Sequence, residues 1–335
     1  MAELTRIKGS QPLVANYGYA NGEEVRNDFD SKYPYSEIHE VVDDYGNRWV
    51  QIPKFYRCMN VENGAVKGRE LSEYRVDDNW ALNHSFTNNA GFVVNYIEVA
   101  KYQMSLDNNG VPCSVPGVYP SRGLTIAQAR EAVKKLNERE DGYEYFLYNI
   151  WTSQIEQDLF VVEFANSYAP SVISGYPAYF DKGYQMTGTT DKIPYCTGIE
   201  SENSHNNKAD SMKYRHIENI YGNGMLYIDG IYLQNSDIYV SINNETYKSN
   251  LPRLVSSGPI HQLGYDSQLD LVFPKNTNST GSYTDYYDGL QANETKVAIY
   301  RGNYSTEGYG LFSMMQMAEN TKLNDATYRI VRRLK

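Results

Sequence analysis

Two helical patterns stand next to each other in the middle of the chain, and they limit the folds open to it. The first, TIAQAREAVKKLNER, opens on Thr125 with Gln128 three residues later, the spacing of a capping box. The second, WTSQIEQDLFVVEFAN, offers Ser153 and Glu156 in the same arrangement. Apolar residues at helical spacing predict helices over 125–139 and 151–166, with inward stripes of Ile126, Ala129, Val133 and Leu136, and of Ile155, Leu159, Val162 and Ala165.

Strand-like segments make up most of the remaining sequence. Before the helices, GNRWVQIPKFYRCM and GFVVNYIEVAKYQM read as strands. After residue 168 come short tyrosine-rich strands separated by Gly, Ser and Asn loops, and this order predicts an α+β fold. Residues 1–44 have no sustained helical period, so we expect a β-rich amino-terminal arm or attachment segment there and one domain over residues 45–335.

Composition and charge narrow the range of partners. The chain has 32 Tyr against 10 Phe and 3 Trp. Tyrosine among Asn, Ser and Gly is typical of a recognition surface, although half-buried tyrosines of a β-rich fold would give the same count. A formal net charge of -10 argues against nucleic acid or an anionic membrane surface as the partner.

The cysteines and the chain ends give weaker signals. Cys58, Cys113 and Cys196 are odd in number and lack a CxxC spacing, so we expect reduced thiols rather than a disulfide framework or a zinc site. The amino terminus has no apolar signal core, and no run approaches the roughly 20 apolar residues of a membrane span. Folding in a cytoplasm without membrane insertion is the expectation.

The segment YRHIENIYGNGMLYIDGI, residues 214–231, concentrates charged and aromatic residues in the manner of an active site. Its pattern is similar to a motif of the C-type-lectin-like fold in the formylglycine-generating-enzyme branch. The matching residues are Arg215, Glu218, Asn219, Ile220, Tyr221, Gly222 and Asn223, followed later by Tyr300, Arg301, Gly302, Arg329 and Arg332. The chain departs from the motif at His216, Gly224, Leu226 and Asn303.

Within that fold, residues 28–335 most resemble tail proteins of phages and prophages and the variable proteins of diversity-generating retroelements. DFDSKYPYSEI, GNRWVQIPKFY and LFVVEFANS carry this likeness. The resemblance implies two helices packed on short twisted antiparallel sheets, with 214–231 as a central strand and its turn. It also implies structural roles for Arg215, Glu218, Asn219, Gly222, Asp229, Arg301 and Arg329.

Catalytic chemistry has little support in the residues. No cysteine follows Cys196, so the thiol oxidation known in that branch does not carry over, and GxSxG and HExxH motifs are absent. Two convergent carboxylates of a glycosidase stay open. The signatures of calcium-dependent lectins are missing, although SLDNNG (105–110) is similar to a calcium-binding loop. We expect no catalytic residue, no metal and no cofactor.

Surface recognition is therefore the expected activity. The resemblance places receptor contacts on the loops around the last strands, at Tyr283, Asp285, Tyr286, Tyr287, Asn303, Tyr304, Tyr309, Met315, Gln316 and Asn320. It implies a noncatalytic receptor-binding protein in a virion tail, made in the bacterial host cytoplasm. The partners would be a bacterial cell-surface glycan or protein, other tail or baseplate proteins and two further copies in a homotrimer. A structural baseplate or fibre component without receptor contact is the alternative.

Overall fold

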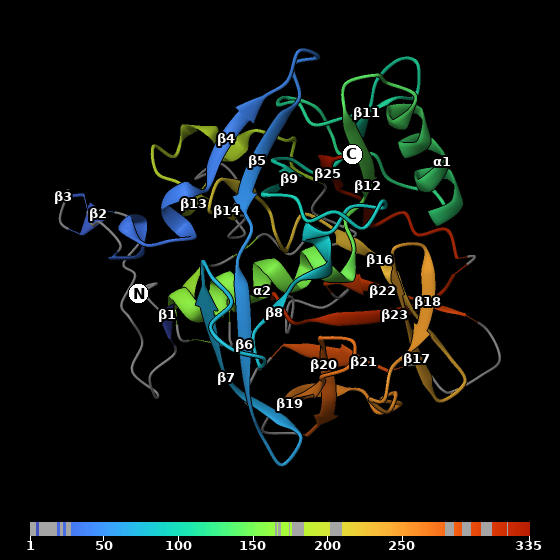
Figure 1. The fold of residues 1–335 in the computed structure, drawn as a ribbon. Coiled ribbons are helices and arrows are strands. Elements are labelled where there is room, and N and C mark those ends of the chain that lie inside the picture. Colours follow the sequence, from blue (N-terminus) through green and yellow to red (C-terminus); the bar gives the residue numbers. More distant parts are fainter. Residues whose placement is uncertain are drawn as a thin grey trace.

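The computed structural model describes residues 5–6, 19–20, 23–24, 28–164, 166, 169–173, 175, 184–201, 210–278, 285–289, 296–302, 310–319 and 321–335. Strands predominate in it. Helix α2 (Ile150–Phe164) runs through the middle of the molecule, and sheets lie on several sides of it (Figure 1). Because nearly all of its side chains are buried, α2 is a core helix rather than a surface one.

A five-stranded antiparallel sheet joins the two halves of the chain, in the order β12-β25-β9-β5-β4. Its strands are β4 (His39–Val42), β5 (Arg48–Pro53), β9 (Tyr96–Ala100), β12 (Tyr143–Leu147) and β25 (Ile330–Leu334). The last strand of the chain thus lies between β9 and β12, and β12 forms one edge.

The larger sheet has thirteen strands among the described residues, with the path β18-β17-β16-β22-β23-β21-β19-β7-β6-β8. Strand β16 pairs with β17, β22 and β24. The bounds are β1 (Thr5–Arg6), β6 (Tyr56–Glu62), β7 (Ala65–Ser72), β8 (Ala81–Leu82), β16 (Met225–Gln234), β17 (Asp237–Ile242), β18 (Glu245–Lys248), β19 (Gly258–Asp266), β20 (Leu271–Thr277), β21 (Tyr286–Asp288), β22 (Val297–Arg301), β23 (Met314–Ala318) and β24 (Ala326–Thr327).

Smaller elements complete the described chain. Strands β13 (Gly198–Ser201), β14 (Asp210–Tyr214) and β15 (Ile217–Glu218) form a three-stranded sheet. Two hairpins are formed by β2 (Tyr19–Ala20) with β3 (Glu23–Glu24) and by β10 (Ser105–Leu106) with β11 (Pro112–Cys113). The short helices are α3 (Ala169–Val172), η1 (Asp28–Ser31), η2 (Tyr35–Glu37), η3 (His84–Phe86) and η4 (Thr189–Lys192). The sheet-rich α+β class predicted from the sequence is confirmed at this level.

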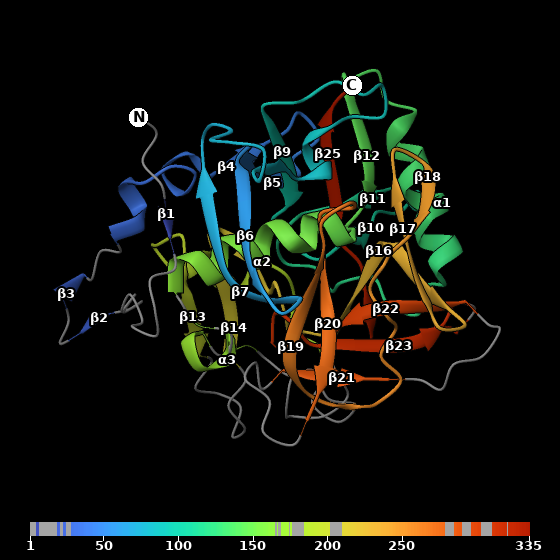
Figure 2. The same ribbon diagram turned by 60° about the horizontal axis from the view of Figure 1, so that its bottom comes forward.

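Helix α1 (Ile126–Asn137) forms as its sequence predicts. Thr125 accepts a hydrogen bond from the Gln128 amide and Gln128 reaches back, which completes the capping box. The predicted apolar stripe is buried, while the opposite face stays in solvent. The helix packs on β12 at the side of the molecule (Figure 2).

The predicted cap of the second helix is wrong. Helix α2 begins at Ile150, and Asn149 Oδ1 accepts the Thr152 amide at 2.9 Å, so Asn149 does the capping. Ser153 and Glu156 lie inside the helix and bond to Arg301. These two polar side chains bind a buried arginine instead of capping the helix. The local sequence does not reveal that arginine, because it lies far away in the chain. Ile155, Leu159 and Val162 are buried as expected, and Ala165 lies outside the described residues.

Residues 28–44 belong to the core rather than to a separate arm. Phe29 and Tyr35 are buried in the main apolar cluster, and the Tyr35 hydroxyl donates to the Leu159 carbonyl at 2.8 Å. Strand β4 pairs with β5 along its full length. The boundary expected at residue 44 therefore falls inside the five-stranded sheet, because β4 completes its edge.

Candidate functional site

Four buried arginines surround α2, and we call them the arginine girdle: Arg57, Arg69, Arg215 and Arg301. Arg301 lies 2.7 Å from Glu156, Arg57 and Arg69 hold the two oxygens of Asp158 at 2.7 and 2.6 Å, and Arg215 lies 2.7 Å from Glu163. A buried charge is tolerated only when it is paired and hydrogen-bonded. The girdle therefore attaches the sheets around α2 to the helix.

The segment 214–231 is largely buried, and we call it the wall. Arg329 is the residue immediately before β25. Its guanidinium donates to the backbone carbonyls of Ala100, Lys101, Glu218 and Asn219 at 2.6 to 3.0 Å. Four non-glycine residues adopt left-handed φ angles there: Arg215 (44°), His216 (71°), Asn219 (49°) and Asn223 (51°). Such backbone persists only where surrounding contacts enforce it.

Glycine at position 224 is required by space as well as by its φ of 106°. A Cβ there would lie 2.8 Å from Thr327 Cγ2 and 3.0 Å from the Asp325 carbonyl oxygen. Gly222 also has a positive φ, 85°. The two glycines let the chain turn tightly into β16.

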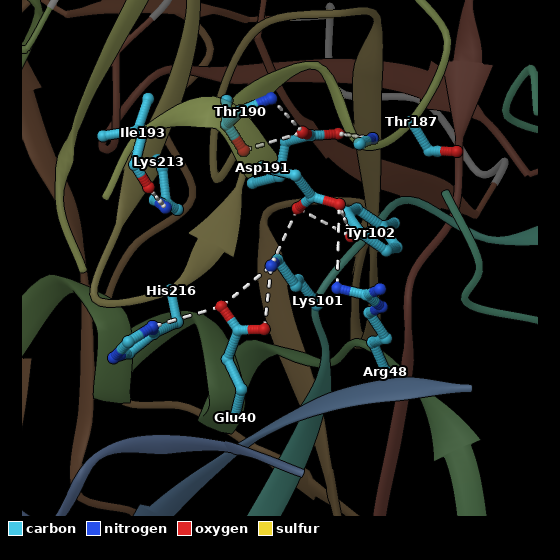
Figure 3. A network of polar contacts seen from close by, with 12 residues as sticks. Glu40, Arg48, Lys101, Tyr102, Thr187, Thr190, Asp191, Ile193, Lys213 and His216 are labelled. Carbon is cyan, nitrogen blue, oxygen red and sulfur yellow. Dashed lines mark hydrogen bonds and ion pairs between the residues drawn. The ribbon is translucent and has the colours of Figure 1, made fainter. Parts of the chain in front are cut away.

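A half-buried polar network lies beside this wall (Figure 3). Lys101 Nζ sits 2.8 Å from both Glu40 and Asp191, His216 Nδ1 lies 3.2 Å from Glu40, and the Tyr102 hydroxyl donates to Asp191 at 2.6 Å. Burial raises the pKa of Glu40, but the hydrogen bonds from His216 and Lys101 outweigh it and lower that pKa to about 2.

The other members of this network point at backbone. Lys213 Nζ donates to the Ile193 carbonyl at 2.8 Å, and burial lowers its pKa. The Glu218 carboxylate accepts the amides of Gly188 and Thr190, both at 2.9 Å. The network thereby fixes η4 and its flanks onto β4, β14, β15 and the residues that follow β9. The groups satisfy one another, an arrangement that suits a structural role.

An open cleft of about 530 Å³ lies elsewhere, where α1, β12, the start of α2, β16, β17 and the β17–β18 turn meet. These elements gather on one side of the molecule in both views (Figures 1 and 2). Strand β16 changes register between Ile228 and Tyr232, and Gly230 within this bulge has φ 70°. Bulges re-aim side chains. Here Asp229 meets Arg130 of α1 at 2.6 Å in the cleft wall.

Charges in the cleft are balanced. Arg130 also lies 3.5 Å from Glu319, at the mouth of an adjoining small pocket, and Arg333 pairs with Glu144. Burial lowers the pKa of His84, so its imidazole is neutral at neutral pH. The remaining polar lining is rich in amides, namely Asn89, Asn137, Asn149, Asn243 and Asn244. Such a lining offers hydrogen bonds without a strong field.

The residues predicted to contact a receptor fall into three groups. Asp285, Tyr287, Met315 and Gln316 are at most 3% exposed, so the exposed position expected for them is not found. Tyr287 lies in β21, Met315 and Gln316 lie in β23, and Asp285 directly precedes β21, so all four are part of the large sheet or its flank. Tyr286 is half-buried. Tyr283, Asn303, Tyr304, Tyr309 and Asn320 lie outside the described residues.

Asp285 has become a structural carboxylate. Its Oδ2 accepts the Phe312 amide at 2.6 Å, and burial raises its pKa to about 7. Of the residues given structural roles, Arg215, Glu218, Asn219, Gly222, Arg301 and Arg329 are buried, whereas Asp229 is half-buried and lines the cleft.

Sequence reasoning missed the cleft. The signals available were an arginine on the solvent face of the first helix and the Asn243–Asn244 pair in a turn, with φ angles of 48° and 65°. Neither indicates a shared site until the β16–β17–β18 strands are placed beside α1. Asparagine in a turn is usually explained by its tolerance of left-handed backbone.

The calcium-like loop is an ordinary turn, in which Asp107 Oδ1 accepts the amides of Asn109 and Val111, each at 2.8 Å. Over the described ranges no three His, Cys, Asp or Glu side chains are placed to hold a metal ion. The three cysteines are free thiols. No helix in the described part of the chain is long and apolar enough to cross a membrane.

Comparison with known proteins adds no family. The chain matches no family model and no curated protein.

Proposed function

We propose that this chain is a noncatalytic receptor-binding protein of a phage or prophage tail, built on a C-type-lectin-like domain. Its target would be a glycan or protein on a bacterial surface. The motif residues that resemble the C-type-lectin-like fold are buried: Arg215 and Arg301 pair with α2, and Glu218 accepts the amides of Gly188 and Thr190. That placement supports a rigid frame as the role of these motifs.

The observation that carries the proposal is the cleft. It is open, its charges are paired, and it stands on α1, β12 and β16, which the core holds rigidly. Its volume is in the range of small-ligand sites, about 300–1,000 Å³. A site with preformed walls loses little entropy on binding, so weak contacts suffice when several copies act together. A homotrimer, the assembly we propose, would supply that multivalency.

Binding to host cells tests this function. Fluorescently labelled protein should bind cells of the host bacterium saturably, and excess unlabelled protein should block adsorption of the phage. A chain that is incorporated into tails but neither binds cells nor blocks adsorption would be a structural component instead. Light scattering on the purified chain tests the trimer, and a stable monomer would contradict it.

A further inference from the structure

We infer that the cleft between α1, β12, β16, β17 and the β17–β18 turn binds an uncharged saccharide. This inference rests on the proposed function, since it names the ligand class of that binding protein. Three features of the lining support it: its charges are balanced, amide side chains lie at its rim, and a side chain already hydrogen-bonds the free backbone groups of its edge strand.

The charge of the lining selects against ions. Two arginines, Arg130 and Arg333, face two carboxylates, Asp229 and Glu144, and each arginine is paired with one of them. The Arg130 side chain is 44% exposed, so the pair is at the surface of the cleft, yet its hydrogen-bonding capacity is directed to Asp229, Tyr227 and Glu319. An acidic or basic ligand would have to break a pair to gain one. An uncharged ligand has no such cost.

The rim supplies the polar contacts. Asn243 and Asn244 are exposed at the turn between β17 and β18, and Ser241 lies beside them. An amide donates and accepts at neighbouring atoms, which matches the adjacent hydroxyls of a sugar ring. Below the rim, Phe146 and Ile242 add apolar surface for the carbon face of the ring.

A peptide strand is the rival ligand, because β12 is the edge of its sheet and edges attract extended chains. The edge is occupied at its centre. Asn137 donates to the Tyr145 carbonyl at 2.8 Å and accepts the Tyr145 amide at 2.7 Å. A peptide adding to β12 would have to displace this side chain from both backbone groups. The geometry therefore favours a saccharide.

The test uses the whole chain with a panel of neutral sugars: glucose, galactose, N-acetylglucosamine and their β-linked disaccharides. Glucuronic acid and an extended peptide are the charged and peptide comparators. Isothermal titration calorimetry at millimolar ligand should give saturable binding to at least one neutral sugar and weaker binding to the comparators. No binding to any neutral sugar, or preference for the acid or the peptide, would overturn the inference.

The variant Asn243→Gly/Asn244→Gly removes both amides and keeps the left-handed turn, because glycine adopts positive φ readily. Loss of the two hydrogen bonds should weaken the bound sugar roughly tenfold or more. The control is Asn63→Gly, which has φ 53° in the β6–β7 turn and does not line the cleft. Equal affinity in the double variant and the wild type would contradict the site.

Cell binding separates the two proposals. If wild type and Asn243→Gly/Asn244→Gly bind host cells equally while no sugar binds, the receptor function stands and the cleft inference falls. If the cleft binds sugar but the protein neither binds cells nor blocks adsorption, the site stands and the tail receptor function falls.

Discussion

The arginine girdle and the cleft both contain arginine–carboxylate pairs, but the two sets of pairs differ in their exposure to solvent. At Arg301 and Glu156 both partners are 1% exposed, and the guanidinium also donates to the Ile220 carbonyl and the Ser153 hydroxyl. At Arg130 and Asp229 the partners are 44% and 21% exposed. The first pair is out of solvent, and its hydrogen bonds go to protein groups. The second pair keeps a face toward solvent, so an arginine–carboxylate pair holds the frame in one place and lines an open cleft in the other.

The largest effect is expected from breaking the girdle. Arg301→Met leaves Glu156 buried without its charged partner, and removing one member of such a pair costs about 3–5 kcal/mol of unfolding free energy. Urea denaturation measures it. The matched control is Arg75→Met, whose partner Asp78 is in solvent, and it should leave the midpoint unchanged. A loss at Arg301 no larger than at Arg75 would show that the girdle does not hold α2.

The next effect tests the wall at Gly224. Gly224→Ala places a methyl group against Thr327 and the Asp325 backbone, and it should cost about 1–3 kcal/mol more than Gly46→Ala. Gly46 has a similar left-handed φ, 79°, but open space around the Cβ position. Thermal unfolding of the two variants compares them. Equal losses would mean that φ alone, and not packing, requires glycine.

A smaller effect on stability is expected at Asp285, which was predicted on the binding surface and is buried in the structure. Its folded pKa, about 7, is above its unfolded value of 3.8 because burial disfavours the charged form. Its contribution to stability is therefore complete below about pH 4 and is lost as the pH rises through about 7. Asp285→Asn removes this titration, so its unfolding midpoint should fall less than that of wild type between those pH values.

The Asp285 variant also separates the two regions functionally. Binding to host cells should be retained at a pH where Asp285→Asn is folded, since the side chain is buried. A variant that folds normally but no longer binds cells would return Asp285 to the receptor site and contradict its structural role.

The two helices show how far sequence reasoning reaches. Helix α1 has one wet and one dry face, so its cap and stripe are local facts that the sequence contains. Helix α2 is buried on nearly every side. Its carboxylates pair with arginines from β6, β7, the β14–β15 turn and β22. Ser153 and Glu156 look like a cap until those distant partners are placed. The error comes from tertiary contacts that local spacing does not encode.

The same reason explains the candidate site. The sequence motif at 214–231 identifies residues that the structure buries, because glycines and left-handed turns constrain backbone locally. The cleft depends on a bulge in β16 and on hairpin residues that lie far from α1 in the chain. Asp229 belongs to both patterns, and the position of Arg130 of α1 beside β16 makes it a residue of the cleft.

Hydrogen exchange measured by mass spectrometry, with and without a saturating neutral sugar, tests the central claim most directly. Binding in the cleft should slow exchange in the β17–β18 turn at Asn243 and Asn244, in β12 and at the end of α1, while α2 beyond its first turn and the girdle strands stay unchanged. Protection that avoids these segments and appears instead around β21 and β23 would contradict the division of the molecule into an inert frame and a binding cleft.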